Sequence, residues 1–198
     1  MVKILSKWYA YLISAAIVVT GFCVGVNIKT TPKATERITF VLCSYDAKVS
    51  NINKKLKTFK PDTIKEVNCR FLQYGANNFT YLFSSLRSAS DFYILPMSYI
   101  ESNVDDVTKY AANIKSDYVN EKVGKSLEYY ENNGEIKGFK VFNGSSNEGV
   151  LVDDITYTYE NDKSDYYLFF TYNSKNIGEL NSSASENAFS IVKELFTL

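Results

Sequence analysis

Histidine is absent from the 198-residue sequence. Without an imidazole the chain cannot form a Ser-His-Asp or Cys-His nucleophile or a histidine-ligated zinc site. Lys plus Arg and Asp plus Glu each number 22, so there is no net field that would attract nucleic acid. We therefore predict a protein that is not an enzyme, uses no cofactor or metal and binds no nucleic acid.

Cysteine is also scarce, with three residues spread along the chain, too few for a disulfide framework. Cys43 and Cys69 each fall in an apolar run that is typical of a strand. Because cysteine packs as a small hydrophobic residue, we predict that both are buried free thiols.

The N-terminal segment contains an uncharged run from Trp8 to Ile28, between Lys7 and Lys29. At about 1.5 Å per helical residue, this run reaches across the roughly 30 Å hydrocarbon core of a bilayer. Residues 1–28 are therefore predicted to form a signal-anchor and transmembrane helix. The predicted location is the cell membrane, with a single pass and with the domain on the extracytoplasmic side.

Two alternatives to an anchor are left open. A cleaved signal peptide normally has a shorter apolar region and an A-x-A-like cleavage site, which this segment lacks. A lipidated Cys23 is the other alternative, although the bulky Phe22 precedes it where a small residue is expected.

Residues 29–37, "KTTPKATER", are short, polar and interrupted by Pro32, and they are predicted to be a linker. Residues 38–198 are predicted to form one α/β domain. Its first part alternates between apolar strand-like runs at 38–45, 64–74 and 92–95 and helix-like periodicity at 49–59 and 79–86. This alternation is typical of βαβ units, so we predict a mostly parallel sheet flanked by helices.

The second part of the domain is less regular. Asn133 and Gly134 lie between two aromatic-rich runs and predict a β-hairpin. Residues 165–173 predict another buried strand, and the apolar residues from 188 to 195 predict a closing helix.

Several polar and aromatic side chains follow the predicted strands. In open α/β sheets, ligands bind beyond the carboxyl ends of the strands, where the order of the strands reverses. If the first three strands lie in the order 2-1-3, the loops after the first and third strands flank this crevice. The predicted ligand-binding residues are Ser44, Tyr45, Asp46, Tyr74, Met97, Ser98, Tyr99 and Tyr172.

Four stretches, "ITFVLCSYD", "DFYILPMSYI", "EYYENNGEIKGFKVFN" and "YYLFFTYNSKNIGEL", also resemble a known family. They are similar to the extracellular solute-binding proteins of carbohydrate-type ABC transporters, in which a D-x-x-x-x-P-like stretch, here Asp91 to Pro96, precedes a cleft-lining loop. The resemblance implies a periplasmic-binding-protein-like lobe, a small polar solute such as a sugar as ligand, and a transporter permease as partner. Family members have two lobes, whereas this chain is long enough for about one.

The function predicted from these observations is a membrane-anchored, extracytoplasmic solute-binding-like protein that binds a carbohydrate for an ABC-type transporter. The alternative is a protein-interaction module at the cell surface, close to a transporter or the cell wall, in which the fold persists without ligand capture.

Overall fold

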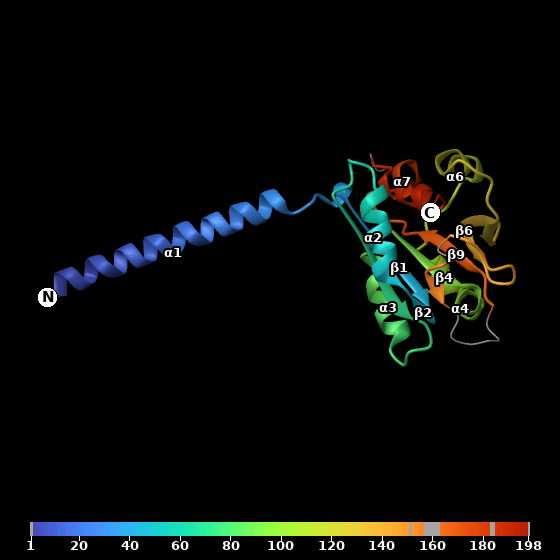
Figure 1. The fold of residues 1–198 in the computed structure, drawn as a ribbon, viewed down its shortest axis with the longest axis horizontal. Helices are drawn as coiled ribbons and strands as arrows, with labels where there is room; N and C mark the ends of the chain where they lie inside the picture. The colour runs from blue at the N-terminus through green and yellow to red at the C-terminus, as the bar shows by residue number, and fades with distance from the viewer. Residues whose placement is uncertain (1, 151, 157–162, 183–184, 198) are drawn as a thin grey trace. The chain divides into compact units, whose positions relative to one another are not determined.

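The computed structural model describes residues 2–150, 152–156, 163–182 and 185–197. The chain divides into two units, Met1–Lys33 and Ala34–Leu198. The first unit consists mainly of helix α1 (Val2–Thr30), and the second contains all the other helices and strands (Figure 1).

Helix α1 corrects the prediction for the N-terminal segment. Among the described residues, no helix combines the length and the apolar character that are needed to cross a membrane. The prediction relied on the absence of charge between Trp8 and Ile28, but this run also contains the polar residues Ser14, Thr20 and Asn27 and two glycines. The predicted transmembrane helix, and with it the single-pass location at the cell membrane, is therefore wrong.

A seven-stranded mixed sheet forms the centre of the second unit, with the strand order β3-β1-β4-β9-β6-β5 and with β7 paired to β6. Its strands are β1 (Arg37–Ser44), β3 (Glu66–Gln73), β4 (Phe92–Pro96), β5 (Tyr129–Asn132), β6 (Glu135–Asn143), β7 (Glu148–Gly149) and β9 (Tyr166–Phe170). Strand β1 pairs in parallel with β3 and β4, whereas β9 pairs antiparallel with β4 and β6, and β6 pairs antiparallel with β5 and β7. Strands β2 (Asp46–Ala47) and β8 (Ile155–Thr156) form a separate two-stranded sheet.

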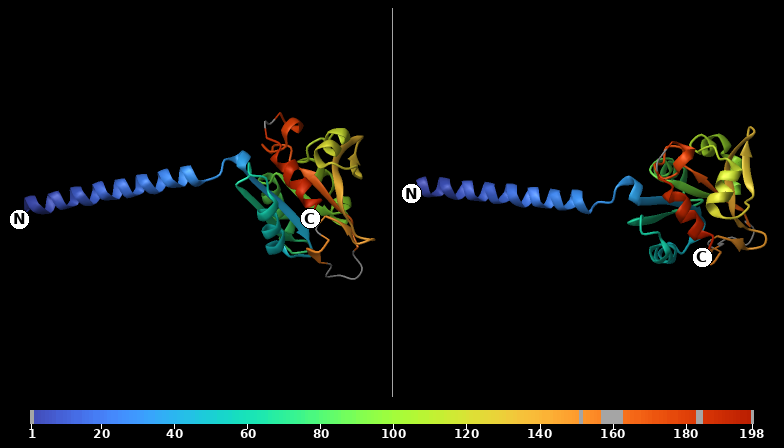
Figure 2. Two further views of the ribbon diagram at one scale, coloured as in Figure 1. Left: turned by 45° about the horizontal axis from the view of Figure 1, so that its top comes forward. Right: turned by 90° about the horizontal axis from the view of Figure 1, so that it is seen from above.

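Helices cover both faces of the large sheet (Figures 1 and 2). One face packs against α2 (Val49–Phe59), α6 (Ser116–Val123) and α7 (Asn187–Leu195). The other packs against α3 (Phe79–Ser88), α4 (Met97–Ser102) and α5 (Val104–Thr108). Short 3₁₀ helices occur at η1 (Ala34–Glu36) and η2 (Gly178–Leu180).

The two sides of a strand are buried in different cores because successive residues point to opposite faces. In β1, Phe40 packs in the cluster with α2 and α7, while Val41 packs in the cluster with α3 and α4. Cys43 and Cys69 are buried free thiols, as predicted. Burial raises the pKa of the Cys43 thiol well above its ordinary value.

The strand order β3-β1-β4 is the order 2-1-3 on which the predicted site depended, and the residues of β4 are all buried. The hairpin at Asn133 and Gly134 is also confirmed, since these two residues connect the antiparallel strands β5 and β6. The predicted mostly parallel sheet of a periplasmic-binding-protein-like lobe is wrong, however, because β9, β6, β5 and β7 extend the parallel part with antiparallel pairs. The domain is α/β with a mixed, mostly antiparallel sheet.

Candidate functional site

The carboxyl ends of β1 and β4 meet at one edge of the sheet, because the two strands run parallel and pair Phe40 with Phe92. Strand β1 ends at Ser44 and strand β4 at Pro96. The two predicted loops therefore leave the sheet at the same edge, as the strand order requires.

After β1 the chain is held by a segment that is distant in sequence. Ser44 is buried, and its Oγ donates a hydrogen bond to the carbonyl oxygen of Asp46 at 2.9 Å. The backbone of Asp46 pairs with Thr156, and the Lys48 N–H donates to the carbonyl oxygen of Asp154 at 2.8 Å. This side of the predicted crevice is therefore closed by strand β8, which leaves the Asp46 side chain exposed.

Three of the predicted tyrosines pack against one another. The ring centroids of Tyr45 and Tyr74 lie 5.0 Å apart, and those of Tyr74 and Tyr99 lie 5.9 Å apart, both in edge-to-face geometry. Tyr99 also contacts Phe79 at 4.9 Å and is only 4% exposed. The structure thus brings these rings together, with Tyr99 in the aromatic core between the sheet and α3 and with Tyr74 and Tyr45 half-buried beside it.

The Tyr99 hydroxyl is buried, and its oxygen has no hydrogen-bond partner among the described residues. Burial raises the pKa of Tyr99 to about 12, because the phenolate would lose its hydration. A neutral phenol without a hydrogen-bond partner lowers the stability of the fold, and its hydroxyl group is not accessible to a ligand from solvent.

Met97 and Ser98 are the two predicted residues that line a cavity. The cavity has a volume of about 280 Å³, and its wall consists of Met97, Ser98, Glu101, Ser145, Lys163, Ser164 and Asp165. Two hydrogen bonds tie its sides together: the Met97 N–H donates to the carbonyl oxygen of Asp165 at 2.8 Å, and the Ser98 N–H donates to Ser164 Oγ at 3.2 Å.

We call this cavity the edge cavity. Ion pairs and a hydrogen bond hold its wall in place. Asp165 Oδ1 accepts a hydrogen bond from the Gly144 N–H at 2.9 Å, and Asp165 Oδ2 lies 2.8 Å from Lys140 Nζ. Lys140 Nζ also lies 2.6 Å from Glu128. Burial lowers the pKa of Lys140, but the hydrogen bonds to Asp165 and Glu128 outweigh this effect, so the pKa lies above its ordinary value. Lys140 therefore stays charged and holds Asp165 in place.

Gly144 is required where the chain turns beside this wall. A Cβ atom at this position would lie 2.2 Å from the carbonyl oxygen of Lys163 and 2.4 Å from that of Ser164. Both contacts are with backbone, which cannot rotate away. The position of the 163–165 segment thus depends on a residue without a side chain.

Sequence reasoning missed the residues of the edge cavity that come from the 144–165 region, and it missed Glu101 of α4. The segment reaches the edge because β9, which follows it, starts opposite Pro96 in the antiparallel pair with β4. The one local signal was the charged residue Asp165 directly before the apolar run of β9.

Tyr172 lies away from the other predicted residues. Strand β9 runs antiparallel to β4 and pairs Phe170 with Phe92, so the residues after β9 emerge at the amino end of β4. The Tyr172 side chain is 52% exposed, and its ring lies 6.4 Å from that of Tyr110. The direction of one strand has therefore moved this tyrosine to the opposite edge of the sheet.

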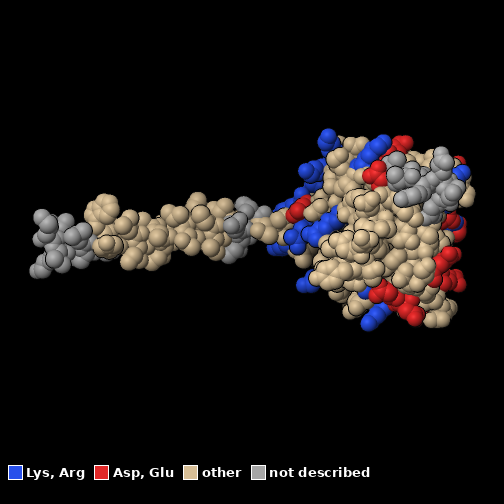
Figure 3. All heavy atoms as spheres, turned by 90° about the horizontal axis from the view of Figure 1, so that it is seen from below, with Lys and Arg blue, Asp and Glu red and all other residues tan. Residues whose placement is uncertain are grey.

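The charged side chains of the domain are unevenly spread over its surface. On the face in Figure 3, Lys and Arg side chains gather toward one side of the domain and Asp and Glu side chains toward the other. In the part of the chain that the structure describes, no group of three or more His, Cys, Asp or Glu side chains has the arrangement needed to hold a metal ion. What the edge cavity offers is hydroxyl groups, two carboxylates and one ammonium group.

The comparisons with known proteins add no relative. No protein-family model, no curated protein and no solved structure matches the chain. The resemblance to solute-binding proteins therefore stays a prediction.

Proposed function

We propose that the α/β domain binds a small polar solute, carbohydrate in class, in the edge cavity. The observation that carries this proposal is the position and lining of that cavity. It lies at the carboxyl edge of the parallel strands. Its wall combines Met97 and Ser98, where α4 begins directly after β4, with the polar residues Ser145, Lys163, Ser164 and Asp165. This is the place where open α/β sheets bind ligands.

The lining suits a polyhydroxylated molecule. Glu101 and Asp165 offer carboxylate oxygens that accept hydrogen bonds from sugar hydroxyls, and Lys163 offers donors. Met97 supplies an apolar surface for the C–H face of a sugar ring. Tyr45, Tyr74 and Tyr99 do not line the cavity, so no tyrosine platform contributes to the proposed contact.

The size of the cavity sets the expected affinity. A volume of about 280 Å³ lies just below the range of about 300–1,000 Å³ that is usual for ligand pockets, so it suits a single sugar ring rather than an oligosaccharide. With an open cavity and exposed charges at its rim, we expect dissociation constants near 1 mM, or about −4 kcal/mol. Delivery of the solute to a transporter permease remains a prediction from the resemblance alone.

The test is an NMR titration of the full chain with a panel of monosaccharides. The readout is the backbone amide signals of Ser98 and Ser164. Binding should shift these two signals and saturate in the millimolar range. Lys163→Ala and Glu101→Gln should each weaken binding several-fold, since each removes a charge-assisted hydrogen bond. Lys57→Ala and Glu131→Gln, at exposed positions outside the cavity, are the matched controls and should bind as the unmodified chain does.

A protein-interaction module is the second candidate, and two exposed aromatic side chains favour it. Phe59 at the end of α2 is 52% exposed and Tyr81 on α3 is 78% exposed, and aromatic residues are enriched at protein interfaces. The same titration separates the candidates. If no monosaccharide shifts the signals of Ser98 and Ser164, solute binding in the edge cavity is refuted and the interaction module takes its place.

A further inference from the structure

A second cavity lies at the opposite edge of the sheet, where β1 and β4 begin and where the chain leaves β9. Its volume is about 170 Å³. The residues that carry the argument are Arg37, Thr39, Ser90, Asp91, Ser174 and Asn176, all of which line it. We call it the entry cavity, because its lining includes the first residues of the domain.

The carboxylate of Asp91 is held rigidly in this cavity. Its Oδ2 accepts a hydrogen bond from the Thr39 N–H at 2.8 Å, and its Oδ1 accepts from Ser174 Oγ at 2.6 Å and from Asn176 Nδ2 at 2.8 Å. Ser174 and Asn176 are themselves buried. These donors are all neutral, so they fix the carboxylate without cancelling its charge. An ionised carboxylate accepts about four hydrogen bonds, which leaves Asp91 with capacity for a further donor.

A cation lines the same cavity without reaching this carboxylate. Arg37 is the first residue of β1 and is exposed, and it lies two positions before Thr39, on the same side of the strand. Among the described residues, neither the guanidinium of Arg37 nor the carboxylate of Asp91 takes part in an ion pair. Lys175 also lines the cavity. The entry cavity therefore presents the fixed carboxylate of Asp91 and the cationic side chains of Arg37 and Lys175, and Arg37 and Asp91 form no ion pair with each other.

We propose that the entry cavity binds a small zwitterion of the α-amino acid type. The ammonium group of such a ligand would donate to Asp91, and its carboxylate would accept the paired N–H groups of Arg37. A simple anion would be repelled by Asp91, and a simple cation would be repelled by Arg37. A molecule that carries both charges a few ångströms apart satisfies both groups, and the cavity volume limits it to a small side chain.

The experiment measures binding to the full chain at neutral pH by calorimetry, with glycine, alanine and serine as probes. Acetate and ethylamine, each with one of the two charges, are the comparison ligands. We expect the amino acids to bind at least about tenfold more tightly than either comparison ligand, because they make two charge-assisted contacts instead of one. Equal affinity for alanine and acetate, or no binding of the amino acids, would refute the proposal.

Variants of Arg37 locate the site. Arg37→Gln should weaken alanine binding by roughly tenfold or more, and Arg37→Lys should lose less because it keeps the charge. Arg70→Gln, at an exposed position on β3 outside the cavity, is the matched control and should leave binding unchanged. Unchanged binding in Arg37→Gln would also refute the proposal.

The outcome is independent of the proposed carbohydrate site. Amino acids should shift the amide signals of Ser90 and Ser174, whereas monosaccharides should shift those of Ser98 and Ser164. Shifts at Ser98 and Ser164 with the amino acids would overturn the entry cavity as their site. A failure of carbohydrate binding would leave the result for the entry cavity unaffected.

Discussion

Replacing Tyr99 by phenylalanine should stabilise the domain. The Tyr99 side chain is 4% exposed, and its hydroxyl oxygen has no hydrogen-bond partner among the described residues. A buried polar group without a partner costs about 1–3 kcal/mol, and the substitution removes this group without leaving a cavity of any size. We expect the free energy of unfolding to rise by about 1 kcal/mol, which raises Tm by about 2–4 °C for a domain of this length.

Tyr93→Phe is the matched control for this prediction, because it removes the same atom from the same aromatic core. Tyr93 Oη donates a hydrogen bond to the carbonyl oxygen of Val107 at 2.8 Å. Here the substitution leaves a carbonyl oxygen without its donor, so the free energy of unfolding should fall by about 1 kcal/mol. Urea denaturation of both variants measures the two changes. The reasoning is refuted if Tyr99→Phe is as destabilising as Tyr93→Phe, because Tyr99 would then have a partner.

The pH dependence of stability gives a second measurement on Tyr99. Its pKa is raised by burial from the ordinary 10.0 to about 12. Between these pH values the unfolded chain loses the phenol proton and the folded chain keeps it, so stability falls as the pH rises. Tyr99→Phe should therefore lose less stability than the unmodified chain between about pH 10 and pH 12.

Three further predictions follow from single contacts. Gly144→Ala should lower the free energy of unfolding by about 1–3 kcal/mol and weaken solute binding in the edge cavity, because the added Cβ would overlap the backbone of Lys163. Melting curves measure the first effect and the monosaccharide titration measures the second. The Asn53 side chain covers the outer edge of β3: its Oδ1 accepts a hydrogen bond from the Cys69 N–H at 2.9 Å, and its Nδ2 donates to the Cys69 carbonyl oxygen at 3.4 Å. Asn53→Ala should therefore lower the free energy of unfolding by about 1–2 kcal/mol and expose the edge of β3, so that oligomers form. Size-exclusion chromatography detects the oligomers. Hydrogen bonds from a lysine and a tyrosine lower the pKa of Glu186 from 4.5, so the ionised Glu186 contributes stability that is lost as the pH falls through the lowered pKa. Glu186→Gln should therefore lose less stability in acid than the unmodified chain. Urea denaturation between pH 3 and pH 6 measures this difference.

The first part of the domain could be predicted because its periodicities are clear. The apolar run of β1 and the three-and-four spacing of Val49, Ile52 and Leu56 on α2 each fit one kind of element. Two successive βαβ crossovers are compatible with the order β3-β1-β4, which the structure has. This order alone places Met97 and Ser98 at the edge where the cavity is found.

The direction of later strands could not be predicted in the same way. The buried run Tyr166–Phe170 is apolar at every position, and such a run has the same pattern in either direction. Tyr172 was predicted as a site residue because it lies near the end of this strand, whereas the antiparallel pairing with β4 places it at the amino end of β4 and brings Asp165 beside Met97. A single undetermined direction thus exchanged one site residue for another.

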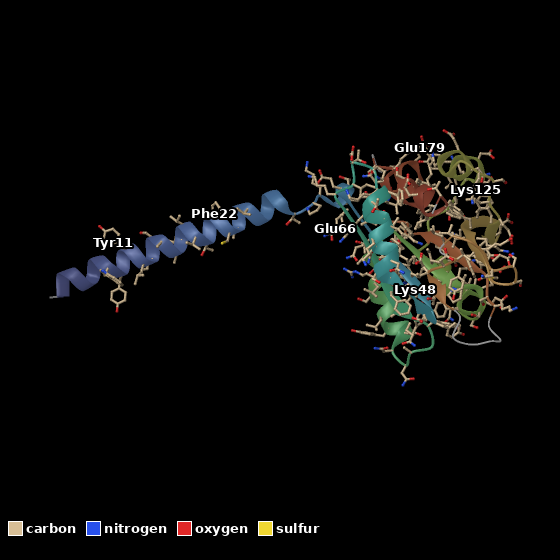
Figure 4. All side chains as sticks on the ribbon, in the orientation of Figure 1. Tyr11, Phe22, Lys48, Glu66, Lys125 and Glu179 are labelled. Atoms are coloured by element: carbon tan, nitrogen blue, oxygen red, sulfur yellow. The ribbon has the colours of Figure 1, made fainter. Side chains whose placement is uncertain are left out.

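The N-terminal helix could not be predicted correctly for a different reason. The absence of charge between Trp8 and Ile28 was visible in the sequence, but the apolar character of the helix as a whole depends on every residue in it. Tyr11 and Phe22 project outward from α1 (Figure 4), and both are exposed within their own unit. The absence of charge alone was therefore not enough to predict a helix that can cross a membrane.

Tyr99 was predicted to line the site because it follows the end of β4, and the local structure after the strand explains why its ring is buried instead. The chain does not continue as a loop after Pro96 but enters α4 at Met97. With about 100° of rotation per helical residue, Tyr99 points roughly 200° away from Met97. Met97 can therefore face the edge cavity while Tyr99 packs against Phe79 in the core. It follows that Tyr99→Ala would remove a core ring and cost about 3–5 kcal/mol, so this substitution measures folding and cannot measure ligand binding.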